Sequence, residues 1–324
     1  YTEYNVPAYM QDCTYLYQQN SVYAMCDVLR NRRAMLGLTQ EQLCEGICSV
    51  KSLRRAEKGQ TDMQMESVRK ILNRLGLSGQ MQWARLITND RDVIKDAEKL
   101  IYYMNNRDYV MAYEKLEKLK LKVSFNIPQN KQFFMEKQAV LDLEQKKIDL
   151  REFLKMEKEA MRCTLPVDNL LNQTNVYLTE REVTCIRNSW SGMEEQEKRK
   201  SIRFLLEFYE KYIEDKGVSE VISMYEFVTE GVVEELGNMG EHEFAQKIDR
   251  KAIRASLSCR RLCDIHYKLY DIWWNENERK KKEGKETSKD EKCRVFKKCI
   301  ILSHYVKRYF YENIYREKLE KLIN

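Results

Sequence analysis

The chain contains 324 residues, of which 33% are charged, and carries a formal net charge of +6 at pH 7. Only 11 glycines and 3 prolines interrupt it, so we predict an almost entirely helical protein with two domains and a large core. No run approaches the roughly 18 apolar residues of a membrane span, and no signal peptide opens the sequence. We therefore expect a cytoplasmic protein with no membrane partner. The mild positive charge permits contact with nucleic acid without requiring it.

The chain begins with Tyr1 rather than Met, and we expect it to be the rear part of a longer protein. Residues 1–21 are interpreted as the remnant of a preceding helical element. The ten cysteines follow no extracellular pattern and are expected to be reduced thiols. Cys259, Cys263 and His266 share a helical face, a spacing that allows metal ligation. Structural zinc usually needs a fourth ligand, so we prefer buried apolar packing there and predict no metal and no other cofactor.

Residues 22–79 have the pattern of a compact unit of short helices. After a first helix, the hydroxyl of Thr39 can cap a second one and form a capping box with Gln42. Ser49 can cap a third helix in the same way, and the spacing predicts a fourth over 65–75. Two short helices joined by a tight turn are typical of a helix-turn-helix, whose second helix enters the major groove of DNA.

The third helix of this unit is predicted over about 50–57, with polar and basic residues on its outward face. Arginine and lysine suit guanine edges and phosphates, and a glutamine beside free backbone N–H groups can contact a phosphate. Leu43, Ile47 and Leu53 are expected to face the core. The residues predicted to contact DNA are Gln40, Lys51, Ser52, Arg54 and Arg55.

Residues 85–324 have the pattern of one helix after another. Turn signals separate candidate helical hairpins, which start near residues 92, 130, 179, 218 and 259. Stacked hairpins at intervals of roughly 40 residues are typical of an α-solenoid. Segments 106–112 and 240–245 resemble the turn into the second helix of a tetratricopeptide repeat. The predicted fold is therefore all-α: a small helix-turn-helix domain followed by an α-solenoid of tetratricopeptide-like hairpins.

The segment 278–298 is too charged to pack in a core. We predict a solvated loop between the last hairpins, and the alternative is an arm that binds nucleic acid.

The motifs of residues 22–79 resemble a known class of DNA-binding domain. The matching pattern is Leu38-Thr39-Gln40-x-x-Leu43, then Gly46-Ile47-x-Ser49, then Leu53-x-Arg55-x-Glu57-x-Gly59. It resembles the XRE class, and the turn Glu45-Gly46-Ile47-Cys48-Ser49 resembles the Rgg/PlcR-type transcription regulators of Firmicutes. Segments 127–132 and 177–182 are similar to recurring parts of the repeat domain in that family.

The resemblance implies a helix-turn-helix joined to tetratricopeptide-like repeats that bind a short signalling peptide, as in quorum sensing. It also implies an ion pair between Arg33 and Glu57 as a fold element. Two residues depart from the family pattern: Arg54 stands where a serine is usual, and Ala56 where a larger apolar residue is usual. Helical sequence before the motif suggests an internal copy, which in such a chain can be retained for packing after losing its operator.

A peptide in the concave face of a solenoid needs partners for its backbone amides, and asparagine offers a donor and an acceptor together. An arginine suits a carboxylate, and tyrosines suit apolar side chains. Each candidate can instead be an internal hydrogen bond or a core aromatic. The predicted peptide-binding residues are Asn130, Gln132, Arg187, Asn188, Tyr225 and Tyr267.

Two functions remain open at the level of sequence. The first is a peptide-responsive transcription regulator that binds double-stranded DNA as a homodimer, because readers of two-fold sites need a dimer. The second is a helical-repeat interaction module in which the helix-turn-helix is structural and does not bind DNA. An enzyme is not expected, since the sequence has no glycine-rich phosphate loop and no nucleophile elbow.

Overall fold

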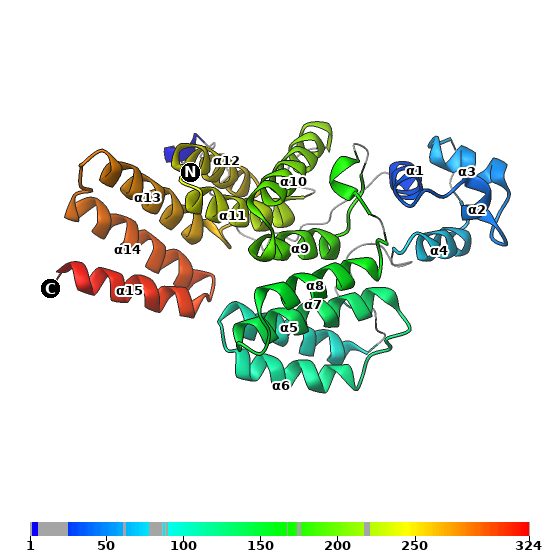
Figure 1. Ribbon diagram of the computed structural model, residues 1–324, viewed down its shortest axis with the longest axis horizontal. Helices are drawn as coiled ribbons and strands as arrows, with labels where there is room; N and C mark the ends of the chain where they lie inside the picture. Colours follow the sequence, from blue (N-terminus) through cyan, green and yellow to red (C-terminus); the bar gives the residue numbers. More distant parts are fainter. Residues whose placement is uncertain are drawn as a thin grey trace. The chain divides into compact units, whose positions relative to one another are not determined.

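The computed structural model describes residues 2–5, 25–60, 63–77, 86, 88, 90–166, 168–173, 176–216 and 221–323. Within these ranges the chain forms fifteen α-helices and no strand, and the helices after the first four are arranged as successive pairs (Figure 1). The predicted all-α fold with paired helices is therefore confirmed. None of the described helices is long and apolar enough to span a membrane.

The first four helices lie inside the range 22–79, for which the sequence predicts a small helix-turn-helix domain. They are α1 (Met25–Met35), α2 (Gln40–Cys44), α3 (Val50–Glu57) and α4 (Met65–Arg74). Thr39 caps α2 and completes the capping box with Gln42, and Ser49 caps α3. Leu43, Leu53, Ile71 and Leu75 are fully buried and form the core of this domain.

The chain divides into two compact units, and the division falls inside one helix, α10 (Glu195–Lys216). One unit contains residues 22–204, and the other contains residues 205–324 with the N-terminal residues 2–5. The helix-turn-helix thus shares a compact unit with the first repeats. The predicted division into 22–79 and 85–324 rests on the helix-turn-helix and repeat patterns of the sequence rather than on compactness. It stays a prediction.

The first repeats are two helical hairpins and a further helix. They comprise α5 (Arg91–Asn105), α6 (Tyr109–Lys120), α7 (Pro128–Glu144), α8 (Leu150–Arg162), the short 3-10 helix η3 (Leu170–Asn172), α9 (Glu180–Ser189) and the 3-10 helix η4 (Trp190–Gly192). The hairpin starts at 91, 128 and 180 lie within two residues of those predicted. Side-chain caps from Asp90, Asp108, Asp149 and Thr179 fix where four of these helices begin.

The second unit continues the same pairing. It contains α11 (Ile222–Asn238), α12 (His242–Ser258), α13 (Ile265–Lys282), α14 (Lys289–Tyr305) and α15 (Tyr309–Ile323), with the 3-10 helix η1 (Thr2–Tyr4). Tyr4 packs with Ile253, Leu257 and Ile265, which ties η1 to α12 and α13. A Cβ atom at Gly237 would lie 2.9 Å from the ring of Trp274, so the glycine permits the close approach of α11 to α13.

The charged segment 278–298 corrects the sequence prediction of a loop. Helix α13 continues to Lys282 and α14 starts at Lys289, so only residues 283–288 connect them. Opposite charges spaced three or four residues apart explain why the segment stays helical. Arg279, for example, binds Glu276 at 2.8 Å and Glu283 at 2.6 Å. The charges form a solvated helical surface.

Candidate nucleic-acid interface

The outward face of α3 is polar and accessible. Lys51, Ser52, Arg54 and Arg55 are all exposed, whereas Leu53 is completely buried and Ala56 nearly so. This division follows the helical period, in which positions three apart share a face. The helix therefore presents three cations and a hydroxyl to solvent while its apolar side holds the domain together.

The start of α3 is fixed by its own serines. The hydroxyl of Ser49 accepts a hydrogen bond from the backbone N–H of Ser52 at 3.1 Å. The two hydroxyl oxygens also lie 2.9 Å apart. The hydroxyl of Ser52 is thus held at the first turn of the helix, beside the backbone N–H groups that have no partner within a helix.

A chain of polar contacts crosses the base of the motif. Arg33 donates from Nε to Glu57 Oε1 at 2.6 Å and from Nη2 to Oε2 at 3.1 Å, so the ion pair that the resemblance implies is present. Gln40 donates to Glu57 at 2.7 Å and accepts from Nε of Arg54 at 3.2 Å. The amide of Gln40 is therefore engaged between Glu57 and Arg54, and it orients Arg54 on the exposed face.

The turn of the motif has a second support, which sequence reasoning missed. Nη1 of Arg74, at the end of α4, donates to the backbone carbonyls of Gln42, Leu43 and Glu45 at 3.2, 3.0 and 2.7 Å. These carbonyls belong to the end of α2, which lacks partners within the helix. The local sequence does not predict this contact, because it depends on how α4 packs against α2.

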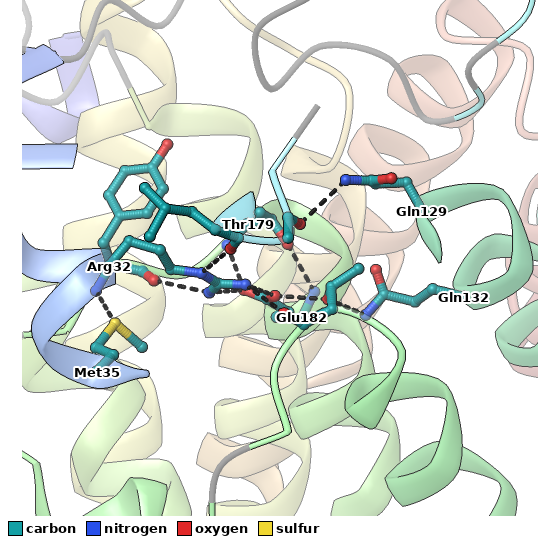
Figure 2. Close-up of polar contacts among 10 residues, drawn as sticks. Arg32, Met35, Gln129, Gln132, Thr179 and Glu182 are labelled. Carbon is teal, nitrogen blue, oxygen red and sulfur yellow. Dashed lines mark hydrogen bonds and ion pairs between the residues drawn. The ribbon is translucent and has the colours of Figure 1, made fainter. Parts of the chain in front are cut away.

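The domain is joined to the repeats by a completely buried arginine (Figure 2). Arg32, on α1, donates through Nη1 and Nη2 to both carboxylate oxygens of Glu182, on α9, at 2.7 and 2.5 Å. Its other N–H groups donate to the backbone carbonyls of Leu75, Tyr177 and Thr164 at 3.0, 3.2 and 3.0 Å. All five guanidinium N–H groups thus have acceptors, as burial of this charge demands.

The acceptors around Arg32 are themselves held by neighbouring side chains. The hydroxyl of Thr164 donates to Glu182 at 2.6 Å and accepts from Gln132, on α7, at 3.0 Å. The other oxygen of Glu182 accepts from the backbone N–H of Thr179 at 2.9 Å as part of the capping box of α9. One carboxylate therefore caps a repeat helix and receives the arginine of the helix-turn-helix.

Two further contacts complete this junction, which we define as Arg32, Gly76, Thr164 and Glu182 with their partners. Gln129 donates to the carbonyl of Gly76 at 3.1 Å (Figure 2). The backbone N–H of Tyr177 donates to the sulfur of Met35 at 2.8 Å. The helix-turn-helix thus rests on the ends of α7, α8 and α9 through specific polar contacts.

The residues predicted to bind a peptide divide into two groups. Asn130, Gln132 and Tyr225 are at most 1% exposed. Asn130 donates to the carbonyl of Ser124 at 3.0 Å and Gln132 belongs to the junction, so their amides serve internal contacts. Arg187, Asn188 and Tyr267 are only partly buried. We therefore base the peptide hypothesis on this second group.

Asn188 belongs to a buried charge cluster that sequence reasoning missed. It donates to Glu136 at 3.3 Å and to Glu157 at 3.2 Å, and Glu136 also receives Lys137 and Arg181 at 2.8 and 3.0 Å. Burial works against the charge of Glu136, but Lys137 and Arg181 keep the pKa of its carboxyl below the usual value. Burial, with Glu136 nearby, raises the pKa of Glu157 well above its usual value.

The possible metal ligands are not brought together. Cys259 and His266 are buried, while Cys263 is exposed. Among the described residues, no group of three or more His, Cys, Asp or Glu side chains is placed to hold a metal ion.

Comparison with known proteins agrees with this architecture. Residues 29–80 match the model of a helix-turn-helix family. The crystal structure of Bacillus thuringiensis PlcR in complex with the peptide PapR7 and DNA superposes with a TM-score of 0.55 at 18% identity, over 91% of this chain and 99% of that chain. PlcR in its apo form gives a TM-score of 0.51 at 15% identity, over 90% and 99%.

ComR from S. thermophilus, crystallised in complex with DNA and its signalling peptide, is similar with a TM-score of 0.48 at 12% identity, over 93% of this chain and 100% of that chain. No curated protein sequence matches this chain. The chain thus contains a helix-turn-helix domain, and it shares the fold of PlcR over nearly its whole length.

Proposed function

We propose that the protein is a DNA-binding transcription regulator whose helical repeats sense a short peptide. The observation that carries the proposal is the exposed row of Lys51, Arg54 and Arg55 on α3, in a domain that matches a helix-turn-helix family. The similarity of the fold to that of PlcR, which was crystallised with a peptide and DNA, supports the proposal that the repeats sense a peptide. On this proposal α3 lies in the major groove, and the protein acts in the cytoplasm.

The experiment for DNA binding begins with selection of bound duplexes from a genomic library. Anisotropy titrations then compare wild type with the triple Lys51→Ala, Arg54→Ala, Arg55→Ala variant at several salt concentrations. We expect the triple variant to lose most of its affinity and to show a shallower salt dependence, because each phosphate contact releases counterions. Lys297→Ala, at an exposed lysine on α14, is the matched control. A wild-type chain that enriches no duplex would refute DNA binding by this domain.

For the peptide, we propose Arg187 and Asn188, both on α9, as one set of contacts, and Tyr267, on α13 of the other unit, as a separate one. The amide N–H groups of Asn188 already donate to Glu136 and Glu157, so we propose only its side-chain carbonyl as a peptide contact. Calorimetry against synthetic peptides of roughly five to ten residues tests this, with thermal stabilisation as a second readout. Absence of heat and of stabilisation for every peptide would count against sensing. We further propose a homodimer, which sedimentation in the presence of DNA would reveal by its mass.

One observation favours a second candidate, a repeat-based interaction module whose helix-turn-helix is structural. The junction fixes this domain to α7–α9 through the fully buried Arg32, which is what a packing role requires. Under this alternative the triple variant and wild type behave alike in the DNA titration. The same experiment therefore separates the two functions.

A further inference from the structure

The guanidinium of Arg54, on the exposed face of α3, is held at one edge and open at the other. Its Nε donates to the side-chain oxygen of Gln40 at 3.2 Å. Within the part of the chain that the structure describes, its two terminal nitrogens have no hydrogen-bond acceptor. These nitrogens carry a pair of parallel N–H groups, which match two neighbouring oxygens of a phosphate or the O6 and N7 atoms of a guanine.

Gln40 is itself fixed from the other side. Its amide nitrogen donates to Glu57 at 2.7 Å, and Glu57 is 4% exposed and also pairs with Arg33 at 2.6 Å. The amide therefore presents its oxygen to Arg54, because its nitrogen is turned to the carboxylate. A side chain that is already ordered loses less conformational entropy on binding, so these contacts preorganise Arg54 for a ligand.

Arg54 lies on the flank of α3 rather than on the side directly opposite the core. The inward side of the helix consists of the buried Leu53, Ala56 and Glu57. At about 100° per residue, Lys51 and Arg55 point away from that side, whereas Arg54 lies between the two sides. It is turned toward Gln40, the first residue of α2. The first helix of a helix-turn-helix crosses the phosphate backbone while the second enters the groove, so this position favours a phosphate over a base edge.

One carboxylate lies near this position, and it does not occupy Arg54. Glu41 is exposed on α2, and hydrogen bonds to its own backbone and to Thr39 lower the pKa of its carboxyl more than the charge of Arg54 does. Among the described residues, no ion pair joins Arg54 to a carboxylate. The charge of Arg54 therefore remains available to an anion from outside the chain.

We infer that Arg54 binds one backbone phosphate of the DNA and that Gln40 is the positioning residue that holds it in place. The inference rests on the proposed function and assigns parts within it: Arg54 binds the phosphate, and Lys51 and Arg55 face the base edges. A phosphate offers two oxygens to the parallel N–H groups of an arginine. In this assignment Gln40, which the sequence predicts to contact a phosphate itself, acts only through Arg54.

The first test uses the full chain and a duplex enriched in the genomic selection. The duplex is prepared as a series in which one phosphate at a time is replaced by an uncharged methylphosphonate. Anisotropy titrations should find one position at which the replacement weakens wild-type binding roughly tenfold. At that position Arg54→Ala should show no further loss, and its salt dependence should be shallower by about one ion. Arg55→Ala, the matched control at the next residue, should remain sensitive to the same replacement.

A double-mutant comparison tests the role of Gln40. Gln40→Ala should weaken binding when Arg54 is present and should have no effect in the Arg54→Ala background, because Gln40 acts through that arginine. Arg54→Lys, which keeps the charge, should restore the salt dependence of wild type. Melting curves check that each variant is folded. Losses that add would show that Gln40 contacts DNA by itself and would overturn its positioning role.

A base contact would give a different result. Replacement of single guanines by 7-deazaguanine removes the N7 acceptor in the major groove. If Arg54→Ala abolishes the effect of such a replacement, Arg54 reads a base and the inference is overturned. The inference also fails, while DNA binding stands, if a duplex is enriched but Arg54→Ala keeps every phosphate sensitivity of wild type. If no duplex is enriched, DNA binding fails and the inference fails with it.

Discussion

Arg32 and Glu182 lie 150 residues apart in sequence and form a bidentate ion pair in which both side chains are completely buried. Arg32 comes from the first helix of the helix-turn-helix, and Glu182 caps α9 of the repeats. Because every N–H group of the guanidinium has an acceptor, the pair fixes distance and orientation together. Any force that turns α9 therefore acts directly on α1.

Arg32→Met should destabilise the unit of residues 22–204 by about 3–5 kcal/mol, because it leaves the Glu182 carboxylate buried without its counter-charge. Urea unfolding followed by tryptophan fluorescence and circular dichroism measures the loss. Lys51→Met, at an exposed lysine, is the matched control and should stay within about 0.5 kcal/mol of wild type.

The double variant Arg32→Met, Glu182→Leu should be more stable than Arg32→Met alone, since the unpaired charge is gone. The single variant Glu182→Leu completes the comparison. If the losses of Arg32→Met and Glu182→Leu simply add up to the loss of the double variant, the two residues act independently, which would contradict the junction.

The local elements of this fold were accessible from sequence because their signals are local. Thr39, Ser49 and the first three hairpin starts follow from hydroxyls, turn residues and helical spacing within a few positions. The last two starts, predicted near 218 and 259, lie at Ile222 and Ile265 in the structure. The Arg32–Glu182 pair gave no such signal. Arg32 and Arg33 are adjacent and alike in sequence, and only the position of Glu182 in the folded chain decides which one is buried.

The segment 278–298 shows the opposite failure. Its charge density predicted a loop, yet the pairs around Arg279 satisfy the charges on the helix surface. Composition alone does not reveal whether opposite charges fall three or four residues apart on one face. The buried cluster of Glu136 and Glu157 was missed for a related reason, since isolated glutamates on helices usually face solvent.

Gln40→Ala should weaken DNA binding while the domain remains folded. Its amide links Glu57 to Arg54, so its loss frees Arg54 to adopt many rotamers on the exposed face. The comparison is Gln42→Ala, which removes the side chain of the capping box and should cost about 1 kcal/mol of stability with less effect on affinity. Anisotropy and thermal melting separate the two. Equal affinity of Gln40→Ala and wild type would show that Arg54 needs no positioning.

Asp271 should make the second unit less stable as the pH rises. Burial, with Glu230 and Glu234, raises the pKa of this carboxyl to about 7, although Lys268 opposes the shift. From about pH 4 to 7 the folded protein holds a proton that the unfolded chain has released, so this contribution is complete below the unfolded pKa and is lost as the pH passes 7. Between pH 5 and 8, the urea midpoint of wild type should fall relative to that of Asp271→Asn. Parallel curves would contradict the raised pKa.

Gly76→Ala should open the junction, and Gly46→Ala provides the control for backbone strain. Both glycines have positive φ, +69° and +67°, which costs roughly 1–2 kcal/mol for any residue with a Cβ. At Gly46 a Cβ has nothing within 4 Å, so only this cost applies. At Gly76 the Cβ would also overlap the carbonyl oxygen of Thr164, whose backbone accepts from Arg32.

We therefore expect Gly76→Ala to lower the unfolding free energy by more than Gly46→Ala does, as urea unfolding of the two variants measures. The extra loss should shrink in an Arg32→Met background. There the arginine no longer bridges the carbonyls of Leu75 and Thr164, so the two backbone segments can move apart. An equal loss for both glycines in wild type would mean that a Cβ at position 76 does not collide with the carbonyl of Thr164. The junction would then be looser than the bonds of Arg32 imply.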